Sequence, residues 1–316
     1  MTPTEEIMNL RLGMDIGGTN IKVGVLDERF QSVTFHIRPV RETDRSESGM
    51  MERLVEMIGE VEREVSPRYG ILTSVGIGIA GIINLREGII TKSPNFPLWN
   101  NMALGVGLRS RIKLPVFIDN DANAATAGEA LCGSGRGSDH FICYTLGTGV
   151  GGGIYLNHHV WRGVDGMAGE LGHMTVEPEG RPCNCGNRGC LEQYASLQGL
   201  KRFVAEHAPA DLQPDDRDLP KMMAERAAKG DMLCRQAFES FGRYLGIAAA
   251  GMLNALNVKK VVLSGGLSNT MPLFLAAMRK EIHSRSFPAV SQGVEILKGG
   301  LGDKAGVYGA AVLDVS

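Results

Sequence analysis

The alternation of apolar and polar positions predicts a chain in which strands and helices take turns. Near its start, RLGMDIGG is followed by NIKVGVLD, a layout that predicts a strand, a tight glycine turn and a second strand. Two more buried strands are expected at TSVGIGIAG and LPVFID. Between the strands, residues 49–65 predict a helix, because Leu54, Ile58, Val61 and Val65 fall on one face.

The second half of the chain repeats this order of elements. HFICYTLGTGVGGGIYLN again predicts a strand, a glycine turn and a strand, and KKVVLSGGLS predicts one more strand and turn. Helices are expected over residues 121–131, about 232–256 and about 304–313. The alternation favours an α/β class, and the repeated layout favours two domains of common design.

Composition narrows the classes of protein. The chain has 316 residues, 43% hydrophobic and 22% charged, and a formal net charge of −2 that gives no general attraction for nucleic acid. We find no apolar run near the ~20 residues that a membrane helix needs. The start, MTPTEEIMNL, carries two acids and lacks an apolar signal core. A cytoplasmic location is therefore expected, where cysteines stay reduced and clusters of them serve as metal ligands.

A cluster of thiols lies in the middle of the chain. CNCGNRGC holds three of the six cysteines, and a histidine precedes it in GELGHMTV. The spacing H-x9-C-x-C-x4-C supplies four ligands of the kind that Zn²⁺ takes: His173, Cys183, Cys185 and Cys190. Buried free cysteines are the alternative, but polar residues and glycines separate these thiols. Four protein ligands leave no open position, so the expected zinc is structural.

Glycine-rich segments point to a phosphate site of an unusual kind. Gly76–Gly81 and Gly147–Gly152 match G-x-G-x-x-G, but neither opens a helix as a dinucleotide site requires, and no G-x-x-x-x-G-K-[ST] is present. The alternative is a clamp built from the turns DIGGTN, LGTGVGGG and LSGG, whose amides and threonines donate to phosphate. Asp15 is a candidate indirect partner of Mg²⁺, and Lys22 adds positive charge.

These motifs resemble one known family. The set DIGGTNIKVGVLD, FIDNDANAAT, LGTGVGGG, GELGH, CNCGNRGCLE and LSGG resembles the ROK family of sugar kinases and repressors, within the actin-like ATPase superfamily. The resemblance implies two actin-like (ribonuclease H-like) domains with a central cleft for ATP and sugar, and a small zinc-bound loop. The implied N-terminal domain covers residues 1–121, with a helix of about 302–316 packing back on it. The implied C-terminal domain covers residues 122–301 and carries the zinc site.

The resemblance also implies roles for single residues. Sugar hydroxyls would be bound by Asn95, Asn120, Asp121, Glu170, His173 and Glu192. MgATP would be held by Asp15, Gly17, Gly18, Thr19, Asn20, Lys22, Gly147, Thr148, Gly149, Gly151, Gly265 and Gly266. Asp121 is the candidate general base, because it follows a strand end and begins a helix. A helix-capping aspartate without chemistry is the alternative for Asp121, and Asp119 is the candidate for a structural role.

The activity implied by the resemblance is phosphoryl transfer from ATP to a hexose. SPNFPLWNN and the complete cysteine motif resemble the glucokinase branch, which makes glucose 6-phosphate. The alternatives are an N-acetylglucosamine or N-acetylmannosamine kinase, a kinase for another hexose, and a ROK-type repressor. Only about ten residues precede the first strand, too few for the DNA-binding unit of a repressor. We expect sugar and MgATP as partners, a homodimer or tetramer, and no nucleic acid or membrane.

Overall fold

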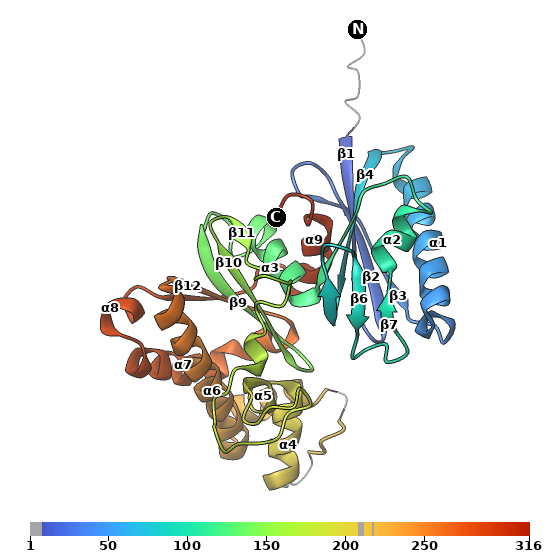
Figure 1. Cartoon of the computed structure of the whole chain (residues 1–316). Helices are drawn as coiled ribbons and strands as arrows, with labels where there is room; N and C mark the ends of the chain where they lie inside the picture. The colour runs from blue at the N-terminus through green and yellow to red at the C-terminus, as the bar shows by residue number, and fades with distance from the viewer. Residues whose placement is uncertain (1–7, 208–211, 217) are drawn as a thin grey trace. The chain divides into compact units, whose positions relative to one another are not determined.

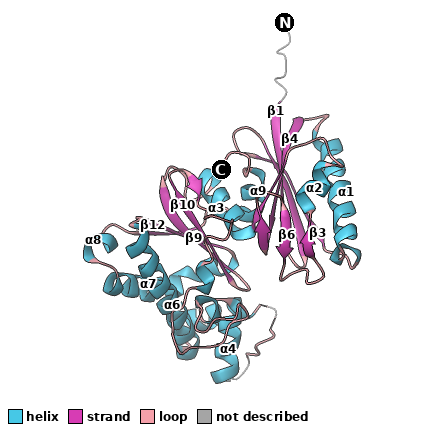
Figure 2. Cartoon of the chain, in the orientation of Figure 1, coloured by secondary structure: helices cyan, strands magenta, loops and turns pink. Residues whose placement is uncertain are grey.

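The computed structural model describes residues 8–207, 212–216 and 218–316. The chain divides into two compact units, and each unit is built around its own sheet (Figures 1 and 2). The first unit consists of the described residues up to Gly137 together with His158–Ala168 and Lys304–Ser316. The second unit consists of Ser138–Asn157 and the described residues of Gly169–Asp303.

The sheet of the first unit has five strands in the order β3-β2-β1-β4-β8. The first three strands pair antiparallel, and β1, β4 and β8 run parallel, so the sheet is mixed. β4 lies inside the parallel part and is buried at six consecutive positions, the pattern expected when both faces of a strand are covered. The strand bounds are β1 (Met8–Ile16), β2 (Asn20–Leu26), β3 (Ser32–Pro39), β4 (Gly70–Ile79) and β8 (Val116–Asn120).

Helices cover both faces of this sheet (Figure 1). α1 begins after Ser46, whose hydroxyl accepts a hydrogen bond from the Gly49 amide, and turns its apolar face to the sheet. The helices are α1 (Glu47–Val65), α2 (Leu104–Arg109), α3 (Asp121–Cys132) and α9 (Ala305–Ala311). Short elements complete the unit: η1 (Thr43–Arg45), β5 (Ile82–Asn84), β6 (Ile89–Lys92), β7 (Asn100–Met102), β11 (His159–Val160) and η5 (Gly302–Lys304), the last of which spans the boundary.

The boundary between the units differs from the expected one at residue 121. α3 belongs to the first unit, because it packs directly on α9 and on β4. A Cβ at Gly309 would lie 1.6 Å from the carbonyl oxygen of Ala124, and one at Gly128 would lie 2.8 Å from the Gly309 amide. Only glycine allows backbones to approach so closely. The chain therefore leaves the first unit at Gly137, in the glycine-rich stretch after α3.

The second unit contains the strand order β10-β9-β12-β13, again with an antiparallel pair followed by parallel strands. Its strands are β9 (His140–Leu146), β10 (Val150–Leu156), β12 (Lys260–Ser264) and β13 (Glu295–Lys298). Its helices are α4 (Leu197–His207), α5 (Leu219–Ala228), α6 (Met232–Leu256), α7 (Met271–Arg285) and α8 (Pro288–Ser291). Its short helical turns are η2 (Leu171–His173), η3 (Leu191–Gln193) and η4 (Gly266–Thr270).

The α/β class with mixed sheets is confirmed. α6 has the expected bounds because Asp231 caps its first turn and Asn257, in the left-handed region, ends it. The sequence did not point to β3 or to the small sheet β5-β6-β7, whose strands are short or only partly buried. Within the described ranges, none of the helices is long and apolar enough to span a bilayer.

Candidate functional site

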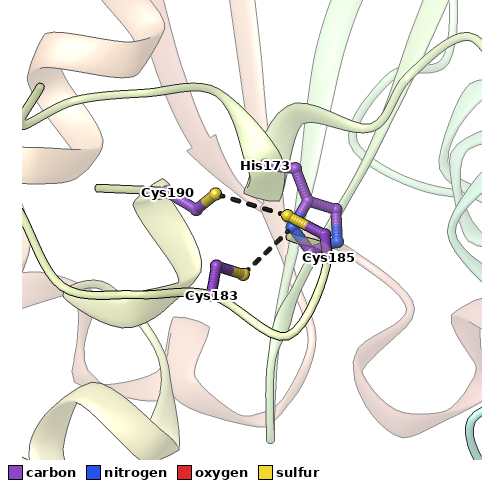
Figure 3. Close-up of side chains that lie close together, drawn as sticks. All are labelled: His173, Cys183, Cys185 and Cys190. Atoms are coloured by element: carbon purple, nitrogen blue, oxygen red, sulfur yellow. Dashed lines mark hydrogen bonds between the residues drawn. The ribbon is translucent and has the colours of Figure 1, made fainter. Parts of the chain in front are cut away.

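The four expected metal ligands lie together in the second unit (Figure 3). The ligand atoms of His173, Cys183, Cys185 and Cys190 all lie within 4.8 Å of one another. The Sγ atoms of Cys185 and Cys190 are 3.7 Å apart, and Nδ1 of His173 is 3.6 Å from Sγ of Cys183. The four residues whose spacing in the sequence predicted a metal site therefore form a cluster in the folded protein.

Tight turns in the cysteine segment bring these ligands together. The Cys183 amide donates to the Asn187 carbonyl at 2.9 Å, and the Gly186 amide donates back to the Cys183 carbonyl at 3.0 Å. Gly186 and Gly189 both have positive φ, which side chains other than glycine rarely adopt. A Cβ at Gly189 would lie 1.7 Å from the Glu177 carbonyl oxygen. The glycines in CNCGNRGC are thus required by the turn geometry.

This donor set fits a tetrahedral zinc ion. With Zn–S bonds of ~2.3 Å and Zn–N bonds of ~2.1 Å, a regular tetrahedron separates its ligand atoms by about 3.6–3.8 Å. The two distances given above fall in this range. Burial, followed by hydrogen bonds and charge from Cys185 and Cys183, raises the pKa of the Cys190 thiol to about 12. A thiol with a raised pKa keeps its proton at neutral pH, and a bound metal ion would displace that proton. The resulting soft thiolate binds Zn²⁺ in preference to harder cations such as Mg²⁺.

The other ring nitrogen of His173 faces a carboxylate. Nε2 lies 4.0 Å from Oε2 of Glu170, which stands one turn earlier. The side chain of Glu170 is half exposed, at 53%. Nδ1 faces the cysteines, so a metal on that nitrogen leaves Nε2 and Glu170 side by side for hydroxyl groups.

Glu192 contacts the glycine hairpin between β9 and β10. Its Oε2 accepts a hydrogen bond from the Val150 amide at 3.0 Å. A Cβ at Gly149 would lie 2.1 Å from the same oxygen, so the absence of a side chain there makes room for the carboxylate. The structure therefore joins an expected sugar ligand to an expected nucleotide loop, a contact that the sequence did not reveal.

Two of the expected nucleotide loops meet inside the second unit. Gly265, with a φ of 82°, follows β12, and a Cβ on it would lie 2.5 Å from the carbonyl oxygen of Leu146. Leu146 directly precedes the turn Gly147–Gly149. LGTGVGGG and LSGG are thus neighbours at the ends of two parallel strands, where α/β proteins hold phosphate groups.

The first unit gathers its own expected site residues at the carboxyl ends of β1, β4 and β8. Asp15 pairs in register with Gly78, and Gly78 pairs with Asp119. A Cβ at Gly78 would lie 3.7 Å from the Cα of Asp121. The glycine turn after β1 belongs to the same edge: a Cβ at Gly18 would lie 3.2 Å from Oδ1 of Asn95.

Asn120, rather than Asp121, is the main cap of α3. Its Oδ1 accepts hydrogen bonds from the amides of Ala122, at 2.9 Å, and Asn123, at 3.4 Å. Oδ1 of Asp121 also accepts from the Ala122 amide at 2.9 Å. Because Asn120 already caps the helix, capping alone does not account for the carboxylate at position 121.

Asp119 is a structural carboxylate, in agreement with its expected role. It is 2% exposed and accepts from Nε of Arg162 at 2.7 Å, from the Asn120 amide at 2.7 Å and from Nδ2 of Asn123 at 3.1 Å. Arg162 lies 43 residues further along the chain, in the segment that returns to the first unit. The sequence carried no signal for this ion pair.

The pKa of Asp15, on the same edge, departs from its ordinary value. Burial raises the pKa of its carboxyl group above 3.8, and the charge of Lys22, its partner in register on β2, opposes this shift. A Cβ at Gly306 would lie 2.7 Å from the carboxylate carbon of Asp15, so α9 covers this side chain. A hydrated cation near a buried carboxyl group of this kind would favour its ionised form.

Comparison with known proteins identifies the chain. The model of the ROK family matches residues 11–315. The chain belongs to the ROK family. As a ROK protein it is 36% identical over 314 residues to a glucokinase of Halalkalibacterium halodurans, covering 96% of this chain and 94% of that protein. A xylose repressor of Bacillus spizizenii is 30% identical over 312 residues, covering 97% of this chain and 78% of the repressor.

Solved ROK structures include both kinds of protein. A ROK family glucokinase from Streptomyces griseus, in complex with glucose and AMPPNP, has a TM-score of 0.77 and 33% identity, covering 96% of this chain and 98% of that chain. A ROK family transcriptional regulator, a homologue of the Escherichia coli MLC protein, has a TM-score of 0.87 and 27% identity, covering 96% of this chain and 77% of the regulator. The ROK fold therefore serves kinases and regulators alike.

Proposed function

We propose that this ROK protein is an ATP-dependent hexose kinase whose main substrate is glucose. The observation that carries the proposal is the pair of carboxylates around Asn120. Asp119 is a buried structural carboxylate, ion-paired with Arg162 and hydrogen-bonded to Asn120 and Asn123. Asp121 is half-buried at the start of α3, where Asn120 is the main cap. The glucokinase relatives, which the chain matches over almost their whole length, support the same reading.

Asp121 acts as the general base in this proposal. It accepts the proton of the sugar hydroxyl, expected to be the 6-hydroxyl, while that oxygen attacks the γ-phosphorus of ATP. Phosphoryl transfer passes through a loose transition state, so the hydroxyl loses its proton late and a carboxylate of ordinary basicity suffices. The bond between the γ-phosphorus and the bridging oxygen breaks, and ADP leaves.

Amides and carboxylates hold the sugar in this proposal. The groups are Asn95, Asn120, Glu170, Nε2 of His173 and Glu192. Sugar hydroxyls both donate and accept, so mixed amide and carboxylate partners fix their orientation. Asn120 has one amide N–H to offer the sugar, since its oxygen caps α3 and Nδ2 also donates to the Gly81 carbonyl at 3.4 Å.

The nucleotide is held by the glycine turns. After β1, the residues are Gly17, Gly18, Thr19 and Asn20, and Lys22 adds positive charge. The other turns offer Gly147, Thr148, Gly149, Gly151, Gly265 and Gly266. A bound Mg²⁺ would neutralise charge on the triphosphate, and Asp15 would accept hydrogen bonds from the water shell of that ion.

The cluster of His173 and three cysteines holds a structural Zn²⁺. The metal supplies no chemistry to the transfer; it cross-links a loop rich in glycine that has little core of its own. That loop runs from His173 to Cys190: it begins three residues after Glu170 and ends directly before η3, the turn that carries Glu192. We further propose that each unit is an actin-like (ribonuclease H-like) domain, as its antiparallel-then-parallel strand order suggests.

A sugar-responsive regulator is the second candidate function, because the repressors and the MLC-like regulator share this fold. A coupled ADP-release assay with MgATP separates the two functions. The sugars are glucose, mannose, fructose, allose, N-acetylglucosamine and N-acetylmannosamine, and Asp121→Asn is the control for contaminating kinases. We expect strong turnover on glucose and none with the control variant. Preference for an N-acetylated sugar would move the substrate assignment, and sugar binding without turnover on any sugar would favour the regulator.

A further inference from the structure

Gln193 connects the metal cluster to a helix outside it. It is the last residue of η3 and is 5% exposed. Its Nε2 donates to Sγ of Cys183 at 3.3 Å, and its Oε1 accepts a hydrogen bond from Nη1 of Arg202, on α4. A buried amide that bridges a cysteine sulfur and a guanidinium is well placed to act on the metal ligand.

Arg202 fixes which way the amide of Gln193 points. A guanidinium carries only donors, so it must face the amide oxygen. The amide nitrogen is then directed at Cys183, and this orientation follows from the chemistry of the partners rather than from the placement of oxygen and nitrogen alone. If the amide were turned by 180°, its N–H groups would face the N–H groups of Arg202, and its oxygen would face the Cys183 sulfur. A cysteine sulfur bound to a metal has no proton to donate and accepts such a hydrogen bond.

The backbone of Gln193 ties down the same region. Its amide donates to the Cys190 carbonyl at 3.0 Å, and its carbonyl accepts from Nη1 of Arg181 at 3.0 Å. One residue thus contacts two of the four ligand residues, Cys183 through its side chain and Cys190 through its backbone. The preceding residue, Glu192, holds the glycine hairpin through Val150.

We propose that Gln193, oriented by Arg202, is a positioning residue of the metal centre: it holds the Cys183 sulfur in place for the ion and connects the metal loop to the turn that carries Glu192. This role rests on the proposed zinc site and not on the identity of the sugar. Partners of metal ligands in other proteins change metal affinity by about 10–100-fold when they are removed.

Two substitutions at position 193 test the role. Gln193→Met keeps the length of the side chain and removes the donor. Gln193→Glu keeps the acceptor for Arg202 and turns a carboxylate oxygen toward the sulfur, where the donor stood. Gln236→Glu, at an exposed site on α6, makes the same chemical change away from the cluster and is the matched control.

The measurement is competition for zinc between each purified full-length protein and a chromophoric chelator. We expect zinc affinity about 10–100-fold lower for Gln193→Met, a larger loss for Gln193→Glu, and wild-type affinity for the control. Arg202→Met, which leaves Gln193 in place but frees its amide, should give a smaller loss and serves if the position 193 variants fail to fold.

Wild-type affinity in Gln193→Glu and Arg202→Met would overturn the role. A wild-type protein that binds no zinc would overturn the metal site and the role together. If the protein does not phosphorylate glucose but the variants show the expected order of zinc affinities, only the proposed function would be overturned.

Discussion

The glycine hairpins of the two units have one layout and two chemistries. In each unit an antiparallel pair is followed by two parallel strands: β1-β2 with β4 and β8, and β9-β10 with β12 and β13. In the first hairpin, the next-to-last residue of β1 is Asp15, which pairs with Lys22 on β2. In the second hairpin the corresponding pair is Thr145 and Gly151, which carry no charge.

The second hairpin receives its carboxylate from outside. Glu192 reaches the Val150 amide from a turn that adjoins the metal cluster, 42 residues further along the chain. In the first unit, the strand itself places the acidic group. In the second, the turn that follows the cluster of His173 and three cysteines places it. The comparison therefore assigns the loop a functional task, which is to complete a hairpin that has no charge of its own.

The largest effect is expected from a substitution that removes the proposed base, Asp121. Asp121→Asn should lower kcat on glucose by about 10²–10⁴-fold, because the amide cannot accept the hydroxyl proton. Glucose affinity should stay within about threefold, since the amide still binds a hydroxyl. Steady-state kinetics and calorimetric titration with glucose measure the two quantities. Equal losses in turnover and in binding would mean that Asp121 only holds the sugar.

The next largest effect is expected from a substitution that removes a ligand of the proposed metal. Cys185→Ser should abolish zinc retention and lower Tm by roughly 5–10 °C, because the loop loses its cross-link. The KM for glucose should rise more than the KM for MgATP, since Glu170, His173 and Glu192 lie on or beside this loop. Metal analysis and thermal unfolding measure the effect. A zinc-free variant with wild-type kinetics would contradict the task assigned to the loop.

A smaller effect separates the charge of Glu192 from its hydrogen bond to the hairpin. Glu192→Gln keeps an oxygen for the Val150 amide and loses the negative charge. The KM for glucose should rise about 10–100-fold, the size expected when a hydrogen bond to a charged group is weakened, while the KM for MgATP changes little. Glu239→Gln, on the exposed face of α6, is the control. A rise confined to MgATP would reassign Glu192 to the nucleotide.

The smallest effect concerns stability rather than catalysis. Since burial raises the pKa of Asp15, the folded protein binds this proton more tightly than the unfolded chain does. Ionisation of Asp15 therefore costs stability as the pH rises through its folded-state pKa. Asp15→Asn should raise Tm at pH 8, and the gain should shrink below about pH 4, where the carboxyl group is protonated in both states. Thermal unfolding across this range measures it; a lower Tm at pH 8 would contradict the assignment.

The sequence predicted what is encoded locally. Asp231 and Asn257 define both ends of α6, and the spacing of His173, Cys183, Cys185 and Cys190 predicted their cluster. In each case the signal lies within a few turns of chain. The α/β class followed from the same kind of periodicity.

The features that the sequence did not predict depend on contacts between distant segments. The pair Asp119–Arg162 and the hydrogen bond from Val150 to Glu192 each join residues more than 40 positions apart. The position of α3 in the first unit depends on its close approach to α9, which only the folded backbone displays. Asp119, which pairs with an arginine, and Asp121, which begins a helix, cannot be told apart from the letters DND alone.

The central claim is that this chain moves a phosphoryl group from ATP to glucose. The most direct test is phosphorus NMR of the products formed by the wild-type protein with MgATP and glucose. We expect glucose 6-phosphate and ADP in equal amounts, formed about 10²–10⁴-fold more slowly by Asp121→Asn. Inorganic phosphate with ADP but no sugar phosphate, or unchanged ATP in the presence of bound glucose, would contradict it.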